Sequence, residues 1–157
     1  MKQTNKSGLP SVRKKPSHDE EDMQMALCEY IQYQYPNVSF TSEASGFLKL
    51  KPYQAARAKK MRSSKGLPDL LIFHPNQTHH GLMLELKKEG TKLFLKNGDF
   101  TANAHVQEQL AVIQHFNRLG YFADFAVGID EARAVVDAYM NNQTLSVTYT
   151  PLDLDAL

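Results

Sequence analysis

The stretch GLPDLLIFHPNQTHHGLMLELKKEG contains two apolar segments that carry charged residues where a buried strand is normally uncharged. The polar stretch between them, HPNQTHHG, has Pro, Asn and Gly in turn-forming positions, so the two segments are predicted to pair as antiparallel strands. If the loop is centred near residue 77, Asp69 faces Glu85 or Leu86, since paired residue numbers have a near-constant sum. Strand alternation places Lys87 on the same face as Glu85.

Two carboxylates and an ammonium group that converge at the edge of a sheet are costly, because like charges repel and each charge loses hydration. A divalent cation removes the repulsion. Hard oxygen ligands favour Mg²⁺ or Mn²⁺ over Zn²⁺, and Mg²⁺ commonly uses one or two carboxylates together with substrate phosphate. This pattern is typical of phosphodiester hydrolysis by a metal-activated water.

The whole chain of 157 residues, 42% of them hydrophobic, has the usual size of one domain. We expect a single domain over residues 19–150, with a C-terminal tail over 151–157. Residues 1–18 hold five cations and no acid, and too few apolar residues to order alone, which predicts a flexible basic tail. Of the 18 Lys and Arg residues, 16 lie in the first 96 positions, which points to an anionic partner.

Periodicity and turn signals divide the domain into alternating elements. A helix is predicted from a capping box at Ser17 and Glu20 to just before Pro36, then a short strand in NVSFTS and a short helix whose first turn holds Pro52. After the two strands of the opening stretch follow a long helix, AHVQEQLAVIQHFNRLG, a strand, YFADFAV, and a closing helix begun by Asp130. LSVTY is a candidate edge strand. This order predicts an α/β fold, a central mixed β-sheet flanked by helices.

The segment from Lys49 to Lys65 holds seven cations and no acid. A charge run is usually a solvated helix face, but the complete absence of acids over 17 residues favours a surface that contacts phosphates. The candidate nucleic-acid-binding residues are Arg57, Lys59, Lys60, Arg62 and Lys65.

The opening stretch resembles the motif of the PD-(D/E)xK nucleases, with Pro68 and Asp69 followed by Glu85, Leu86 and Lys87. Four segments in order, KGLPDLLIF, GLMLELK, EQLAVIQHFNRLGY and FAVGIDEARAVVDAYM, resemble the VRR-NUC branch of these nucleases. The resemblance covers roughly residues 20–140 and implies a core like that of restriction endonucleases.

The resemblance also implies roles for the motif residues. Asp69 and Glu85 are expected to bind the metal, and the Leu86 carbonyl is expected to help complete its shell. Lys87 is expected to steer or activate the attacking water and to stabilise the developing charge. The alternative is a surface salt bridge between Glu85 and a lysine.

A further carboxylate is expected from the first helix of the family. At about 100° per residue, Glu20 falls about 50° from the centre of the apolar stripe, whereas Glu21 falls about 150° away and points to solvent. Glu20 is therefore the preferred catalytic and metal-binding acid, although it also suits the capping box with Ser17. Glu43 is another candidate, or a turn residue.

On the long helix, Gln107, Gln109 and Gln114 compete for the glutamine of the family. Gln109 lies eleven residues before Gly120, the spacing that the resemblance implies, and on the flank of the apolar face. It is expected to orient water or Lys87. A surface-polar role is the alternative.

The histidines suggest a different chemistry. His74, His79 and His80 flank the predicted turn, yet no cysteine or carboxylate completes a familiar zinc spacing. His105 lies one helical turn before Gln109, where it can contact a phosphate or simply face solvent.

The expected function is that of a Mg²⁺- or Mn²⁺-dependent DNA endonuclease that leaves 5′-phosphate and 3′-hydroxyl ends, as the resemblance implies. No base-reading module is visible, so branched, flap or junction DNA is the expected substrate, in phage or bacterial replication, recombination or repair. A homodimer is expected by analogy. The alternatives are an inactive nucleic-acid-binding module of the same fold and a phosphohydrolase acting on nucleotides. The lone Cys28 and the lack of a long apolar run predict a cytoplasmic protein.

Overall fold

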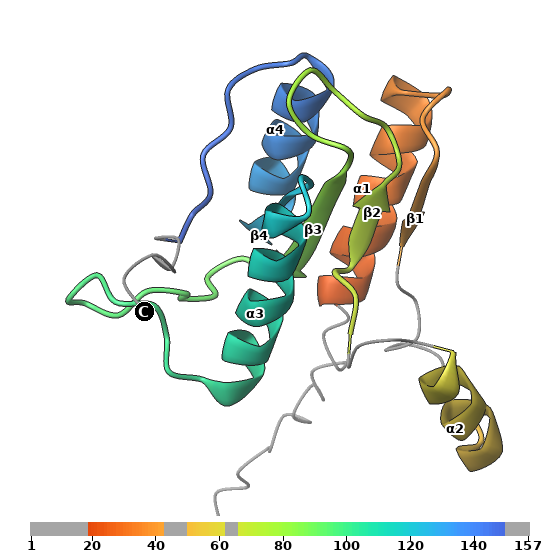
Figure 1. Ribbon diagram of the computed structural model, residues 1–157, viewed down its shortest axis with the longest axis vertical. Helices are drawn as coiled ribbons and strands as arrows, with labels where there is room; N and C mark the ends of the chain where they lie inside the picture. Colours follow the sequence, from red (N-terminus) through yellow and green to blue (C-terminus); the bar gives the residue numbers. More distant parts are fainter. Residues whose placement is uncertain (1–18, 43–49, 62–65, 150–157) are drawn as a thin grey trace, which may run out of the picture.

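The computed structural model describes residues 19–42, 50–61 and 66–149 (Figure 1). Four helices and a four-stranded mixed sheet make up this part of the chain, so the predicted α/β fold is confirmed. In chain order the elements are α1 (Asp19–Gln34), β1 (Phe40–Ser42), α2 (Pro52–Lys60), β2 (Leu70–Ile72), β3 (Leu82–Lys87), α3 (Ala104–Arg118), β4 (Phe122–Val127) and α4 (Ile129–Met140).

The sheet has the order β1-β2-β3-β4. β1 pairs with β2, and β2 with β3, in antiparallel fashion, whereas β3 and β4 are parallel and are connected through α3. Leu70 pairs with Leu84 and Ile72 with Leu82, so the β2–β3 connection is centred on residue 77, as predicted. One further step in this register places Asp69 opposite Glu85.

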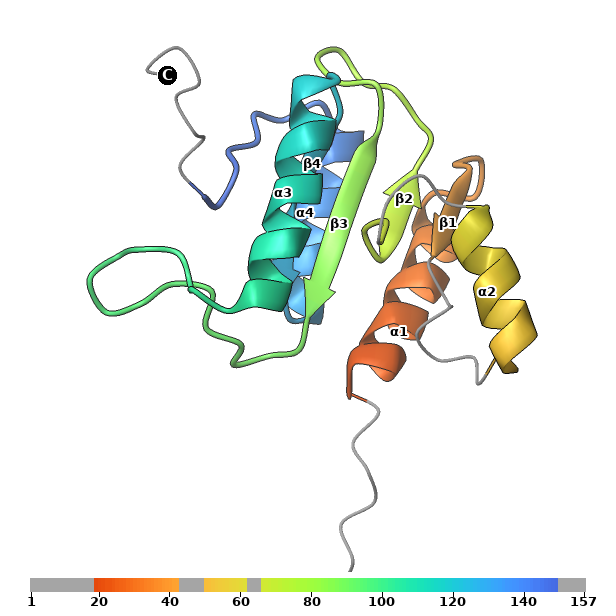
Figure 2. The same cartoon turned by 60° about the horizontal axis from the view of Figure 1, so that its bottom comes forward.

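The two faces of the sheet pack on different helices. Leu82, Leu84 and Leu86 of β3 join the core that contains buried residues of α1 and α4, whereas Met83 joins a core with Ile113 of α3. Figure 2 shows α3 and α4 on opposite sides of β3 and β4. Because neighbouring residues of a strand point to opposite faces, Glu85 shares the α3 side with Met83.

One element boundary differs from the sequence prediction. α4 begins at Ile129 rather than at Asp130, because Gly128 is its N-cap and adopts a positive φ of 82°, which turns the chain sharply out of β4. Asp130 and Glu131 then lie in the first turn, where a helix dipole favours acids. α1 ends at Gln34, before Pro36, as predicted; its proposed N-cap, Ser17, lies outside the described residues.

The predicted edge strand in LSVTY is wrong. Residues 145–149 form no strand, and the segment is held by side chains instead. The Thr148 backbone N–H and hydroxyl both donate to the buried carboxylate of Asp124, at 2.7 Å each. The Asp124 side chain therefore takes the backbone donor that a strand ladder would use.

Among the described residues, the helices are too short or too polar to span a membrane.

Asn117 fastens the C-terminal half of α3 to β4. Its amide nitrogen donates to the Ala123 carbonyl and to the Tyr149 hydroxyl, both at 2.7 Å, and its amide oxygen accepts from the Ala123 N–H at 2.9 Å. Ala123 is fully buried, so no solvent can replace these bonds.

Asn117→Ala is therefore expected to lower the free energy of unfolding by about 3 kcal/mol, since it leaves buried backbone groups unpaired. Urea unfolding followed by circular dichroism measures this loss. The matched control is Asn141→Ala, because the Asn141 side chain is exposed and solvent can replace its contacts with the Asp137 carbonyl and with Tyr35, so its loss is expected to cost less than about 0.5 kcal/mol. Equal losses in the two variants would contradict the role of Asn117.

Candidate active site

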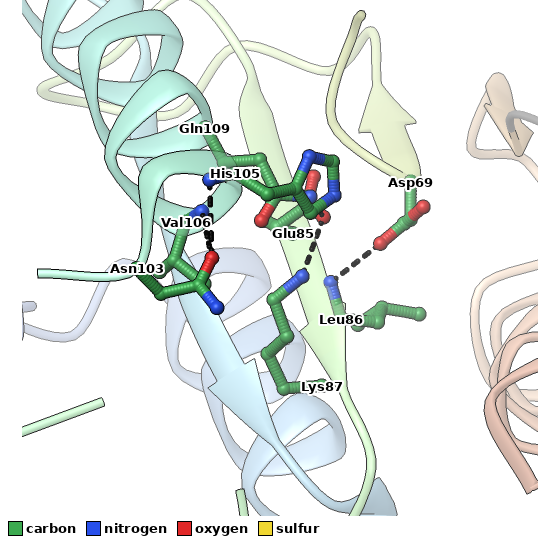
Figure 3. A network of polar contacts seen from close by, with 8 residues as sticks. All are labelled: Asp69, Glu85, Leu86, Lys87, Asn103, His105, Val106 and Gln109. Atoms are coloured by element: carbon green, nitrogen blue, oxygen red, sulfur yellow. Dashed lines mark hydrogen bonds and ion pairs between the residues drawn. The ribbon is translucent and has the colours of Figure 1, made fainter. Parts of the chain in front are cut away.

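Asp69 and Glu85 form an acidic pair beneath α3. Asp69 precedes β2 and Glu85 lies in β3, with only 6% of its surface exposed. The two carboxyl groups line the same cavity, and Asp69 Oδ2 accepts the Leu86 N–H at 2.8 Å (Figure 3). The predicted cross-strand meeting of these two acids therefore occurs in the structure.

The electrostatics of the acidic pair disfavour two full negative charges. Burial, and next the charge of Asp69, raise the pKa of Glu85 to about 7, although Lys87 opposes the rise. Burial also raises the pKa of Asp69, against the lowering effect of the Leu86 N–H and of Lys87. Two carboxylates that repel in a buried site are the usual condition for binding a cation or retaining a proton.

Lys87 supplies the cation of the site. Its Nζ lies 3.0 Å from Glu85 Oε1, and its side chain is only 12% exposed. The same ammonium group lies 6.0 Å from the centre of the Phe125 ring. Strand alternation explains why Lys87 and Glu85 share one face, as the sequence predicted.

Gln109 reaches the acidic pair from α3. Its amide Nε2 donates to Glu85 Oε1, and its own Oε1 is buried and has no hydrogen-bond partner among the described residues. Asn103 fixes the start of the helix, because its side chain accepts the backbone N–H groups of His105 and Val106 at 3.0 and 3.2 Å (Figure 3). Of the other two candidates, Gln107 is exposed and Gln114 lies on the opposite flank of α3.

A cavity of about 130 Å³ opens over the acidic pair. Asp69, Glu85 and Gln109 line it, together with His105 and Glu108 of α3. The structure therefore places His105 beside the site rather than on a remote helix face. Glu108 was missed, because its position one residue before Gln109 gave no reason to single it out.

α1 approaches Asp69 through Gln24, which sequence reasoning also missed. The Gln24 amide donates to the Ser42 hydroxyl and, at 3.1 Å, to the Asp69 carbonyl oxygen, while the Ser42 hydroxyl donates to the same carbonyl at 3.0 Å. Gln24 is 5% exposed. A glutamine one turn before Leu27, within an otherwise apolar stripe, is the signal that could have identified it.

Glu20 lies one helical turn before Gln24, on the same side of α1. It is exposed, since the first turn of the helix extends past the start of β2, and its charge is the smallest cause of the raised pKa of Asp69. Glu21 is half-buried and does not simply point to solvent as predicted. Within residues 19–42, 50–61 and 66–149, no three or more His, Cys, Asp or Glu side chains gather closely enough to hold a metal, so Glu20 does not join the acidic pair in this structure. Glu43 lies outside those ranges.

The histidines of the β2–β3 connection have packing partners. The His79 ring packs edge-on against Phe122 at 5.5 Å, and burial lowers its pKa. His80 packs against Tyr121. His74 is exposed.

α2 carries the described part of the basic segment. None of its residues is buried, and Arg57, Lys59 and Lys60 in its last turn are exposed. Figure 1 shows α2 beyond the end of β1, outside the layers formed by the sheet and the other helices. Arg62 and Lys65, the other two candidates, lie outside the described residues.

Comparison with solved structures shows a fold similar to that of this chain. No protein-family model and no curated protein matches the sequence. Among solved structures, the chain is similar to a protein described as "VRR_NUC domain protein", with a TM-score of 0.57 and 23% sequence identity over 86% of this chain and 99% of that one. At this identity the similarity establishes a VRR-NUC-like fold.

Proposed function

We propose that this protein is a Mg²⁺- or Mn²⁺-dependent endonuclease that hydrolyses phosphodiester bonds in DNA. The observation that carries the proposal is the convergence of the acidic pair, Lys87 and Gln109 in one largely buried cluster on the α3 face of the sheet. The VRR-NUC-like fold and the four-segment resemblance in the sequence support the same function.

The residues present suit a hard divalent cation. Asp69 and Glu85 offer carboxylate oxygens whose repulsion a cation relieves, and the unpartnered Gln109 Oε1 is a further acceptor at the site. The Leu86 N–H points to Asp69, and the N–H and C=O of one strand residue face the same side, so the Leu86 carbonyl faces that edge too. We assign the metal to Asp69, Glu85 and the Leu86 carbonyl, and to Glu20 of α1, which is exposed in this structure and would have to move toward the pair. When bound, the cation polarises the scissile phosphate and makes water a stronger nucleophile at neutral pH.

Lys87 and Gln109 orient the attacking water, and Lys87 also neutralises the charge that develops on the phosphate oxygens. The Lys87 ammonium donates hydrogen bonds to the attacking water and to the phosphate oxygens on which charge develops, in a site where little solvent screens it. The Gln109 amide holds Glu85 in place through its N–H, and its free oxygen accepts a hydrogen bond from the water. In-line attack by water on phosphorus would break the P–O3′ bond, so that the phosphate stays on the 5′ end and the departing 3′ oxygen takes up a proton, as the family resemblance implies.

The basic segment provides contact with the DNA backbone in this proposal. α2 has nine residues and no buried side chain, and an isolated helix of that length is marginal in water. In this proposal the DNA backbone binds along α2 and stabilises it, through contacts of its phosphates with Arg57, Lys59 and Lys60. Arg62, Lys65 and the basic residues 1–18 add further phosphate contacts. Because such contacts carry no sequence information, we propose selection of branched, flap or junction DNA, and a homodimer where both strands are cut.

Salt dependence tests this role of α2. Replacing Arg57, Lys59 and Lys60 together with alanine is expected to reduce the slope of log affinity against log salt by about 2–3, since each lost phosphate contact removes about 0.9. Fluorescence anisotropy with labelled duplex DNA between about 50 and 200 mM salt measures the slope. Arg118→Ala, which removes an exposed cation at the far end of α3, is the control and is expected to leave the slope unchanged. An unchanged slope in the triple variant would remove α2 from the DNA-binding surface.

The nuclease proposal itself is tested by incubating the purified protein with linear, flap and junction DNA in Mg²⁺, Mn²⁺ or EDTA. Cleavage in either metal, absent in EDTA and strongest on structured DNA, is the expected result. Tight binding without cleavage under any metal would instead identify an inactive binding module, and hydrolysis of free nucleotides alone would identify a different phosphohydrolase.

A further inference from the structure

A β-hairpin over residues 93–101 projects from the molecule between β3 and α3 (Figures 1 and 2). The Leu95 N–H donates to the Asp99 carbonyl at 2.7 Å, and the Thr101 N–H donates to the Leu93 carbonyl at 2.7 Å. The base of the hairpin is anchored, because Leu93 is buried in the α3-side core and the Phe100 ring packs on Phe125 at 5.6 Å. The hairpin is therefore a braced projection that begins six residues after the motif lysine, Lys87.

The outer part of this 93–101 hairpin exposes apolar side chains among cations. Phe94 and Leu95 are 40% and 50% exposed, and the exposed Lys92 and Lys96 flank them in sequence. Alternation of cations with exposed aromatic and aliphatic residues suits contact with nucleic acid, where the backbone is attracted to the charges and a base stacks on the ring.

Behind the 93–101 hairpin lies a cavity of about 500 Å³, much larger than the one over the acidic pair. Aromatic side chains contribute to its wall, and amide and carboxyl groups stand beside them; these residues are Phe94, Phe100, Tyr149, Gln107, Gln114 and Asp99. None of the described residues that line it is a cation, and Asp99 repels phosphate. A flat, uncharged ring with hydrogen-bonding edges fits this chemistry, since amides and carboxylates pair with the edges of bases.

The cavity lies on the opposite flank of α3 from the candidate active site. Residues 105 and 109 face the acidic pair, whereas residues 107 and 114 face the large cavity. One helix width, about 10 Å, separates the two flanks, which is about three base steps of DNA at 3.4 Å each. A strand that crosses the N-terminal half of α3 therefore reaches both sites at once.

We infer that the large cavity is a subsite for one unpaired base, within about three nucleotides of the bond that is cut. The inference rests on the proposed function, because it takes DNA as the substrate. A base within a duplex must be unstacked and flipped to enter, which costs free energy, whereas a base in a flap or loop is already free. The subsite thus gives a physical reason for selecting DNA with unpaired nucleotides beside the cut.

Binding without cleavage tests the subsite. In EDTA, Phe94→Ala is expected to weaken binding to DNA with a short unpaired flap about tenfold, the size of one lost base stack, and to leave binding to fully paired DNA within about twofold. Phe94→Leu keeps apolar packing on Phe100 and is expected to lose most of the same affinity, which separates stacking from any loosening of the hairpin. Phe73→Ala, which removes another exposed phenylalanine, is the control and is expected to leave both affinities unchanged.

Single abasic substitutions along the flap make the test specific. One position is expected to weaken wild-type binding about tenfold and to have no further effect on Phe94→Ala. If no position shows this coupling, or if Phe94→Ala weakens flap and duplex equally, the subsite is overturned even where the protein cuts DNA. A protein that discriminates the abasic position but never cuts retains the subsite and overturns the nuclease proposal.

Discussion

Glu85→Gln is expected to make the metal-free protein more stable and, at the same time, inactive. At pH 8 in EDTA the wild-type carboxylate is charged in a buried position beside Asp69. A pKa raised from 4.5 to about 7, at about 1.4 kcal/mol per unit, corresponds to a cost of about 3 kcal/mol. Glutamine keeps the shape and the acceptor for Lys87 but carries no charge, so most of that cost disappears.

The pH dependence of the stability follows from the direction in which the pKa of Glu85 is shifted. A carboxyl group whose pKa is higher in the folded state contributes stability that is fully present below about pH 4.5 and is lost as the pH rises through about 7. The raised pKa of Asp69 acts in the same direction. Wild-type stability in EDTA is therefore expected to decline between pH 5 and 8, by urea unfolding, and the decline is expected to be smaller in Glu85→Gln.

Glu89→Gln is the matched control for this experiment, because Glu89 is an exposed acid four residues further along the chain. It is expected to show the wild-type pH dependence and wild-type cleavage. Glu85→Gln is expected to lose cleavage by more than about a hundredfold, because removal of a group that only orients a metal ligand already costs about 10–100-fold. A variant that is less stable than wild type at pH 8 in EDTA would show that Glu85 is a structural ion-pair partner of Lys87 and nothing more.

Lys87→Ala is expected to lower kcat about 10²–10³-fold, the usual loss when a group that stabilises developing charge is removed. KM is expected to change little, since such a group acts mainly on the transition state. Mn²⁺ binding, measured by calorimetry, is expected to persist because both carboxylates remain. The control is Lys88→Ala, which removes the neighbouring, exposed lysine and is expected to leave kcat unchanged. A fall in DNA affinity with no change in kcat would reduce Lys87 to a phosphate contact.

The sequence was most informative where contacts are local and periodic. The β2–β3 connection is short and its register is symmetric about residue 77, so the arithmetic of paired positions limited the partner of Asp69 to Glu85 or Leu86. Lys87 followed from the two-residue period of a strand, and Gln109 from the spacing that the family resemblance implies together with its place on a helix flank. The family resemblance indicated phosphodiester hydrolysis as the reaction.

The parts that escaped prediction depend on contacts between distant segments. Gln24 lies 45 positions from the Asp69 carbonyl it contacts, and Thr148 lies 24 positions from Asp124. No local periodicity reports such pairs. The exposure of Glu20 depends on where α1 begins relative to the sheet, which helical angles alone do not contain. The 93–101 hairpin was also missed, because its strand pairing is limited to one bridge, between Phe94 and Phe100.

The most direct test of the central claim is single-turnover cleavage of labelled flap DNA in Mn²⁺ by the wild-type protein and by Lys87→Ala, purified in the same way. The wild type is expected to cut, to stop on addition of EDTA, and to exceed Lys87→Ala by about 10²–10³-fold at equal DNA occupancy. Equal cleavage by the two proteins, or cleavage that survives EDTA, would contradict an active site built from Asp69, Glu85 and Lys87.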